Sequence, residues 1–238
     1  MQRDLLDRLL TLRAAKRPAA LVTDLTSGDQ AVVEAGGTAG GLALGAAEVA
    51  AVLGAVRDDR SGLDAETRRF VQVFNPPLRL VVVGAVHIAQ QLVPLAATAG
   101  YDVTVVDPRR AWASGERFPG IALVTDWPDE ALRTLAPDHR TAIVTLTHDP
   151  KLDDPALAAA LSSPAFYIGA LGSLRTQARR LERLRAQGFE AAALARIHGP
   201  AGLDIGAKSP AEIAISILAQ IIQVRRAAPG PAPAGAAP

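Results

Sequence analysis

The sequence predicts an α/β protein in which a parallel β-sheet carries helices on both faces, preceded by a small α+β domain. From Leu78 onward, short β-branched runs alternate with longer stretches of helical periodicity, which is typical of a parallel sheet. The run Leu80–Val83 reaches Gly84, apolar residues then recur at helical spacing, and a second apolar run ends at Asp107. Strand, glycine turn, helix and strand make the βαβ unit that opens a Rossmann-like fold.

The N-terminal part of the chain predicts the small α+β domain. Apolar residues at helical spacing indicate helices over 4–17 and 46–57. The glycine-rich stretch 36–45 is interpreted as a loop with left-handed positions rather than a phosphate-binding loop, because no strand leads directly into it. Alternating or β-branched runs predict short strands over 20–23, 30–34 and 70–74.

Asn75-Pro76-Pro77 marks the predicted domain boundary, because proline restricts its own backbone and that of the residue before it. The predicted domains are residues 1–75 and a Rossmann-like domain over 76–226, followed by a proline-rich tail, 227–238, predicted to be disordered. Within the second domain, strands are predicted over 79–83, 102–106, 121–125, 141–145 and 165–168. Helices are predicted over 88–99, 128–135, 155–161, 173–187 and 210–225.

Composition excludes several classes of function. Lysine and arginine number 25 against 24 acidic residues, so the net charge of +1 gives no reason to expect a nucleic-acid partner. The chain has no cysteine, which excludes disulfides, thiolate metal sites and a cysteine nucleophile. The start, Met1-Gln-Arg-Asp, lacks the apolar core of a signal peptide, and polar residues interrupt the apolar run 80–100. We therefore expect a cytoplasmic protein with no membrane partner.

The turn after the first strand of the parallel sheet departs from a dinucleotide fingerprint. The pattern G-x-G-x-x-G/A has Gly84 and Ala89 at its ends, but Val86 replaces the glycine that lets the backbone approach a pyrophosphate. Asp107 stands where a ribose-binding carboxylate belongs. The sequence thus favours a Rossmann-like frame with another or more weakly bound ligand over tight NAD(P) binding.

Polar residues at strand ends are candidate ligand contacts, because ligands of such sheets lie beyond the carboxyl ends of the strands. His87 follows the first strand and His148-Asp149 the fourth, whereas Asp154 before Pro155 is expected to cap a helix. Together with His198, Asp149 and Asp204, these histidines are a conceivable metal set. No fixed ligand spacing joins them, so no metal site is predicted.

Two glycine-bearing segments near the C-terminus complete the predicted crevice. Gly172-Ser173, with Arg175 in the next turn, suits a phosphate, although a plain turn with a Ser173 cap explains the same residues. Arg179, Arg180, Arg183 and Arg185 are interpreted as a solvent-facing surface. The loop from His198 to Gly206 is predicted to touch a ligand, and Ser209 and Glu212 form a capping box.

Six short stretches together resemble the XdhC/CoxI family, the accessory proteins of molybdenum hydroxylases such as xanthine dehydrogenase and carbon monoxide dehydrogenase. They occur in the family's order and span most of the predicted Rossmann-like domain. They are Val83–Gln90, Val105–Arg109, Ser114–Phe118, Thr147–Asp149, Tyr167–Ser173 and the segment from Ile197 to Ile213.

The resemblance implies a chaperone rather than an enzyme. It would bind molybdenum cofactor in its molybdopterin form and shield it while a sulfurtransferase of the cysteine desulfurase type installs the terminal sulfur. It would then deliver the cofactor to a molybdenum hydroxylase apo-enzyme. No catalytic residue is implied. The implied cofactor-binding residues are Gly84, Val86, His87, Asp107, Arg109, His148, Asp149, Gly172, Ser173, His198, Gly199, Asp204 and Gly206.

The chain departs from the family pattern in two places. The family usually has glycine where Val86 stands, and its N-terminal domain usually carries a cysteine, which residues 1–75 lack. Residues 1–75 are therefore interpreted as a degenerate N-terminal domain of the family. Two other functions stay open: an NAD(P)-dependent oxidoreductase using Gly84, Asp107 and a base such as His148, and a scaffold with a vacant crevice. A homodimer is expected only as the common default.

Overall fold

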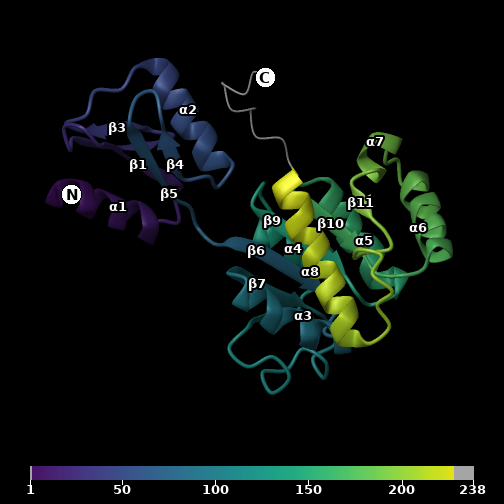
Figure 1. Ribbon diagram of the computed structural model, residues 1–238. Helices are drawn as coiled ribbons and strands as arrows, with labels where there is room; N and C mark the ends of the chain where they lie inside the picture. The colour runs from purple at the N-terminus through teal and green to yellow at the C-terminus, as the bar shows by residue number, and fades with distance from the viewer. Residues whose placement is uncertain (1, 228–238) are drawn as a thin grey trace. The chain divides into compact units, whose positions relative to one another are not determined.

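The computed structural model describes residues 2–227 (Figure 1). The chain forms two compact units that divide between Pro76 and Pro77. The predicted disordered tail lies outside the described residues from position 228 on, and Ala227 is the last residue of a helix. Within the described range, no helix is long and apolar enough to cross a bilayer.

The N-terminal unit is an antiparallel sheet with one helix on each face. The strand order is β3-β2-β1-β5-β4. Its strands are β1 (Ala19–Asp24), β2 (Gln30–Glu34), β3 (Gly37–Gly40), β4 (Gly62–Asp64) and β5 (Arg69–Phe74), and its helices are α1 (Arg3–Ala14) and α2 (Ala46–Arg57). Leucines of α1 pack on Leu21 and Val32, whereas Val52 and Val56 of α2 pack on the opposite face of the sheet.

The glycine-rich stretch of this unit differs from its prediction as a loop. Gly37–Gly40 pairs with β2 as an edge strand, and the strand β4 was not predicted. A Cβ at Gly40 would lie 2.4 Å from the carbonyl oxygen of Gln30, so glycine is needed for this close pairing. The stretch is therefore a structural edge of the sheet.

The C-terminal unit contains the predicted parallel sheet, with helices on both faces. The strand order is β11-β10-β9-β6-β7-β8, and every pairing is parallel. The strands are β6 (Leu78–Val83), β7 (Tyr101–Val106), β8 (Ala122–Val124), β9 (Thr141–Thr145), β10 (Tyr167–Ala170) and β11 (Ile197–His198). The strand order reverses between β6 and β9, which makes this position the topological switch point of the sheet.

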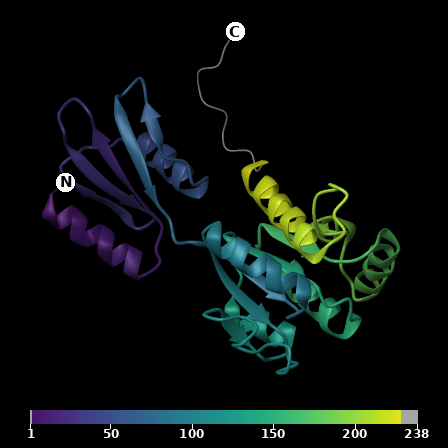
Figure 2. The same cartoon turned by 60° about the horizontal axis from the view of Figure 1, so that its bottom comes forward.

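Each face of this sheet has its own apolar core. Leu80 and Val82 of β6 point to the face covered by α3 and α8, and Val81 and Val83 to the face covered by α4 and α5 (Figures 1 and 2). This fits a strand that is buried on both sides. The helices are α3 (His87–Thr98), α4 (Pro128–Leu135), α5 (Pro150–Leu161), α6 (Leu174–Ala186), α7 (Ala191–Leu194) and α8 (Pro210–Ala227).

The start of α5 corrects one prediction. The helix begins at Pro150, and the side chain of Asp149 caps it by accepting a hydrogen bond from the Lys151 N–H at 2.9 Å. Asp154 is therefore not the cap, and Pro155 lies inside the helix. Asp154 instead pairs with Arg183 of α6 at 2.5 Å and 2.9 Å. By contrast, the predicted capping box at α8 is confirmed, because Glu212 accepts from the Ser209 N–H and Ser209 from the Glu212 N–H.

Candidate functional site

The carboxyl ends of the parallel strands share one edge, and two turns pack tightly there at the switch point. Gly84 follows β6 with φ of 109°, and a Cβ at this position would lie 2.6 Å from Cγ2 of Thr147, which follows β9. Only glycine combines this dihedral with this contact. Thr147 therefore occupies the space beside the first glycine of the fingerprint.

Asp107 is tied into the same edge from β7. Its carboxylate is fully buried and accepts hydrogen bonds from the Ala85 N–H at 2.8 Å and from the backbone and guanidinium of Arg109 at 2.8–2.9 Å. Burial alone would raise the pKa of the Asp107 carboxyl, but these donors bring that pKa below its ordinary value. The carboxylate predicted to bind a ribose is thus ionised and engaged in holding the Gly84–Ala85 turn.

A second arginine braces this turn. Arg117 donates to the carbonyl oxygens of Ala85 at 2.7 Å and Trp112 at 2.8 Å, and to Oε1 of Gln90 at 2.9 Å. The Trp112 ring lies under the guanidinium groups of both Arg109 and Arg117, at 5.0 Å and 5.3 Å from the ring centroid. The segment after β7 is therefore a network that fixes the first turn, with Arg109 acting inside it.

The helix that follows this turn offers free donors at its start. Val86 is the N-cap residue of α3 and makes no side-chain cap, and His87 is exposed as the first helical residue. The first N–H groups of a helix have no partner within the helix, so they point to whatever lies beyond it. The half-buried Val86 side chain stands at the point where the fingerprint has its second glycine.

His148 lies at the next turn in an unusual backbone conformation. Its φ is 60°, in the left-handed region, which is uncommon for residues other than glycine, although asparagine, aspartate and histidine adopt it more often than most. Thr147 before it donates its hydroxyl to Oδ1 of the buried Asp153 at 2.7 Å. The turn after β9 is thus fixed on both sides of His148, by Thr147–Asp153 and by the Asp149 cap, and the imidazole is exposed.

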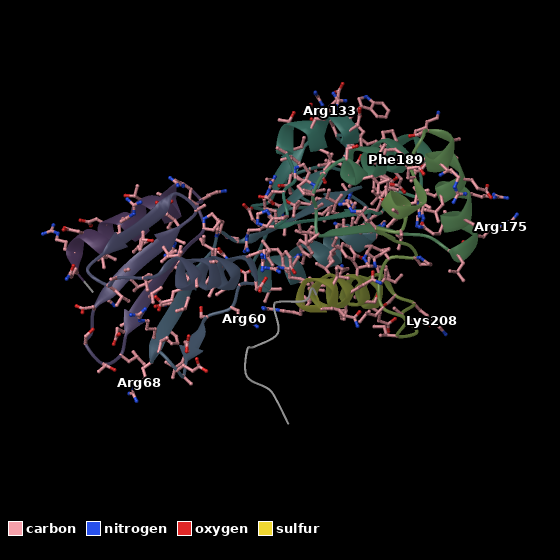
Figure 3. The ribbon with its side chains drawn as sticks, turned by 90° about the horizontal axis from the view of Figure 1, so that it is seen from above. Arg60, Arg68, Arg133, Arg175, Phe189 and Lys208 are labelled. Carbon is pink, nitrogen blue, oxygen red and sulfur yellow. The ribbon has the colours of Figure 1, made fainter. Side chains whose placement is uncertain are left out.

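A cavity of about 380 Å³ opens next to this turn. His148 lines it from the turn after β9, Pro150 and Asp153 line it from α5, and Thr176 lines it from the first turn of α6. The rest of its lining is arginine from α6: Arg175, Arg179, Arg180 and Arg183. Among the predicted cofactor-binding residues, His148 is the one within the described chain that lines this cavity. Figure 3 labels Arg175 on the outer side of α6.

Arg180 corrects the prediction of a solvent-facing arginine surface. Its side chain is 2% exposed and donates to Oε1 of Gln177 at 2.7 Å and to the carbonyl oxygen of Leu171 at 2.8 Å. Its Nε has no hydrogen-bond partner among the described residues, and neither has Oδ2 of Asp153, which lies 3.8 Å from Nη2 of Arg180. Burial lowers the pKa of Arg180 and raises that of Asp153.

The turn after β10 has a structural explanation at its glycine and serine. Gly172 has φ of 147°, and the Ser173 hydroxyl caps α6 by accepting from the Thr176 N–H at 3.1 Å. This matches the alternative in which these residues make the turn and the cap. Ser173 nevertheless stands one residue before the helix whose arginines line the cavity.

The loop from His198 to Gly206 is held by contacts with Tyr167 of β10 and Gln220 of α8. The His198 ring stacks on Tyr167 with 4.9 Å between centroids, and burial lowers the pKa of the imidazole. Gln220 of α8 accepts from the Gly202 N–H at 2.8 Å and from the Tyr167 hydroxyl at 2.7 Å. Asp204 and Gly206 are exposed farther along the loop. The tight glycine-rich sequence thus serves a close approach to α8.

The structure brings some predicted residues together and separates others. Gly84, Asp107 and Arg109 share one network, whereas His148 borders the arginine cavity. No three His, Asp or Glu side chains of residues 2–227 gather closely enough to hold a metal ion. Sequence reasoning missed Arg180 and Arg179 as a possible binding surface. The available signal was spacing, since Arg180 lies four residues from both Thr176 and the buried Leu184 on one helix face.

Comparison with known proteins assigns the family. Residues 80–221 match the model described as the XdhC Rossmann domain. The chain belongs to the XdhC family. This agrees with the resemblance seen in the sequence, and the Rossmann-like parallel sheet of the C-terminal unit is the fold expected for such a domain.

Three curated relatives of the XdhC family are similar to about two thirds of the chain. The uncharacterized protein YqeB of Escherichia coli K12 is 35% identical, covering 68% of this chain and 30% of its own length. A Bacillus subtilis 168 protein named as a probable xanthine dehydrogenase subunit is 35% identical, covering 68% and 48%. The molybdenum cofactor insertion chaperone PaoD of E. coli K12 is 34% identical, covering 64% and 42%. The chain thus spans less than half the length of these relatives.

One solved structure is similar over both units of the chain. A xanthine dehydrogenase from Bacillus halodurans is 27% identical with a TM-score of 0.75, covering 94% of this chain and 67% of that one. Its likeness extends beyond the residues matched by the XdhC Rossmann model.

Proposed function

We propose that this XdhC-family protein binds molybdenum cofactor in its molybdopterin form and assists the maturation of the cofactor and its insertion into a molybdenum hydroxylase. The observation that carries the proposal is the similarity of about two thirds of this chain to a molybdenum cofactor insertion chaperone and to a probable xanthine dehydrogenase subunit. The clients we propose are enzymes of the xanthine dehydrogenase or carbon monoxide dehydrogenase type. Such an accessory needs no covalent chemistry of its own.

The side chains at the carboxyl edge fit an anionic cofactor. Molybdopterin carries a phosphate, and the arginine-lined cavity holds a buried guanidinium, Arg180, with an unpartnered Nε. We propose that the cofactor lies along this edge, held by His148, by Gly172-Ser173 and by the free donors at His87. The bound cofactor supplies molybdenum redox chemistry to the client enzyme, while the residues of this chain bind it and exclude water.

Two protein partners follow from this function. One is the apo-hydroxylase that receives the cofactor, and the other is a sulfurtransferase of the cysteine desulfurase type. Because the chain has no cysteine, it cannot carry a persulfide itself, so the sulfur must stay on the donor until transfer. We further propose that residues 1–75 are a degenerate N-terminal domain of the family, and that the protein acts in the cytoplasm, with a homodimer as its default state.

The proposal is tested by cofactor retention. Purified protein is incubated with molybdenum cofactor, desalted and oxidised, and the fluorescence of the pterin is measured in the protein fraction. Wild type should retain the pterin and His148→Asn should retain less. Asparagine is chosen because it tolerates the left-handed backbone at this position. His139→Asn, which changes the same residue type outside the lining of the cavity, is the control.

Nicotinamide binding is the alternative that the same material tests. The Asp107 carboxylate is engaged by Ala85 and Arg109, and Val86 stands at the pyrophosphate position, so neither favours NAD(P). Micromolar NAD(P)H binding without pterin retention would replace the cofactor proposal with an oxidoreductase. If neither ligand binds, the scaffold with a vacant crevice is the remaining function.

A further inference from the structure

We propose that the cavity between α5 and α6 is a phosphoryl-binding site, in which Arg175, Arg179 and Arg180 hold the terminal phosphate of a small phosphate monoester. The inference deepens the proposed function, which already uses this cavity for the pterin phosphate, but its test does not depend on the identity of the molecule that carries the phosphate.

The side chains around the cavity carry an excess of positive charge, which favours an anion. Arg183 is neutralised by Asp154, which it contacts through two hydrogen bonds. Arg175 and Arg179 line the cavity and form no hydrogen bond or ion pair within residues 2–227. Arg180 faces Asp153, at 3.8 Å. The cationic excess is therefore carried by Arg175 and Arg179, and it disfavours a metal cation as the occupant.

Arg180 supplies the observation that points to a missing ligand. A buried guanidinium normally uses all of its donors, because an unpaired buried N–H group costs free energy. Here Nη1 and Nη2 are satisfied by Gln177 and Leu171, but Nε is buried without a partner in the described chain. This Nε has almost no accessible surface, so an acceptor oxygen in the cavity reaches it only if the Arg180 side chain or its neighbours shift.

The cavity also lies at the starts of two helices. The cavity is lined by Pro150 at the first position of α5 and by Arg175 and Thr176 in the first turn of α6. The N-termini of α5 and α6 therefore lie at the same cavity, and the positive end of a helix dipole favours a negative charge there. A phosphate monoester has three terminal oxygens, enough for a guanidinium on each side and a hydroxyl or N–H group between them.

The size of the cavity fits more than an inorganic ion. Its volume of about 380 Å³ is at the lower end of the range for small-molecule pockets, which begins near 300 Å³. The phosphoryl group would lie at Arg180 with part of the attached molecule beside His148 and Pro150. The site therefore suits a phosphorylated small molecule rather than a phosphate ion alone.

Calorimetric titration with inorganic pyrophosphate and with adenosine 5′-monophosphate tests the site at constant ionic strength. We expect saturable binding to wild type and at least tenfold weaker binding to the double variant R175Q/R179Q. Both arginines are exposed, so replacing them should not disturb the fold. R185Q removes the same charge from an exposed position on the same helix outside the cavity, and should bind as wild type. Absence of saturable binding, or an equal loss in R185Q, would overturn the proposal.

Chemical footprinting gives a second test without any substitution. Phenylglyoxal modifies accessible arginines, and mass spectrometry locates the modified residues. Pyrophosphate should protect Arg175 and Arg179 at least fivefold and leave Arg185 reactive. Equal rates with and without pyrophosphate at all three positions would contradict the proposed site.

Competition distinguishes the source of the phosphoryl group and separates this inference from the proposed function. Displacement of pyrophosphate by molybdenum cofactor supports the site and identifies the pterin phosphate as its occupant. Binding of adenosine monophosphate tenfold tighter than pyrophosphate supports it and identifies a nucleotide. If pyrophosphate binds and pterin is not retained, the phosphoryl site stands and the cofactor function fails. If R175Q/R179Q retains pterin fully and pyrophosphate does not bind to wild type, the cofactor function stands and the phosphoryl site fails.

Discussion

Asp107 and Asp153 are two buried aspartates near the same edge of the parallel sheet, and they differ in how their oxygens are used. Both are almost fully buried. Asp107 accepts from Ala85 and Arg109 through both oxygens, whereas Oδ2 of Asp153 has no hydrogen-bond partner in the described structure. Burial raises the pKa of Asp153, but donors overcome the same effect at Asp107 and its pKa falls.

The difference separates scaffold from binding surface. At the Asp107 end, the carboxylate that a ribose would need is already engaged by Ala85 and Arg109, so it holds the turn after β6. At the Asp153 end, unsatisfied groups of Asp153 and Arg180 flank a cavity. Saturated polar groups stabilise a fold, whereas the unpaired Nε of Arg180 marks where an anion would complete the network; Asp153 opposes that anion.

The largest effect should come from Gly84→Ala, which alters the turn that Asp107 holds. The new Cβ would lie 2.6 Å from Thr147 at φ of 109°, so both backbone strain and overpacking oppose folding. We expect a loss of about 3 kcal/mol or more in the free energy of unfolding, measured with urea. Gly100→Ala, with φ of 87° and open space around it, is the control and should cost about 1 kcal/mol. Equal losses would show that the Thr147 contact is unimportant.

Asp107→Asn should have the next largest effect. Both oxygens of Asp107 accept hydrogen bonds, so the amide NH2 of asparagine must face the donors of either Ala85 or Arg109, and we expect a loss of about 1–3 kcal/mol at pH 7. The folded pKa of Asp107 lies below 3.8, so the carboxylate stabilises the fold above that pH and its contribution is lost as pH falls through the folded pKa. The stability difference from wild type should therefore shrink below about pH 4. The exposed Asp126→Asn is the control, and a pH-independent difference would contradict this role.

Asp153→Asn tests the cavity between α5 and α6. It removes a negative charge 3.8 Å from Arg180 while leaving an oxygen to accept from Thr147. Pyrophosphate should bind about three- to tenfold more tightly at pH 7, by calorimetry, because less repulsion opposes the anion. A weaker interaction would mean that Asp153 is needed to position the Arg180 guanidinium.

The smallest effect is expected at the N-cap of α6. Ser173→Ala removes the hydroxyl that accepts from the Thr176 N–H and should cost about 1 kcal/mol in urea unfolding. Ser173→Asp keeps a capping oxygen and should restore most of that stability. If the aspartate variant is as unstable as the alanine variant, Ser173 acts other than as a cap.

Local patterns predicted the parallel sheet, because each strand is a continuous apolar run ending in a glycine or polar turn, as at Gly84. They could not choose between Asp149-Pro150 and Asp154-Pro155 as the start of α5, since both pairs have the same capping chemistry. Local patterns also could not predict that the Arg180 side chain is buried. Its partners include the carbonyl oxygen of Leu171, which only the folded chain brings to it.

Gly199 places the last strand of the sheet against the amide of Gln177. A Cβ at this position would lie 2.2 Å from the amide carbon and oxygen of Gln177, the side chain that accepts from Arg180. The 198–206 loop and the guanidinium in the cavity are therefore joined by a single side-chain amide. A side chain larger than glycine at position 199 would displace this amide, which is the acceptor of one Arg180 hydrogen bond.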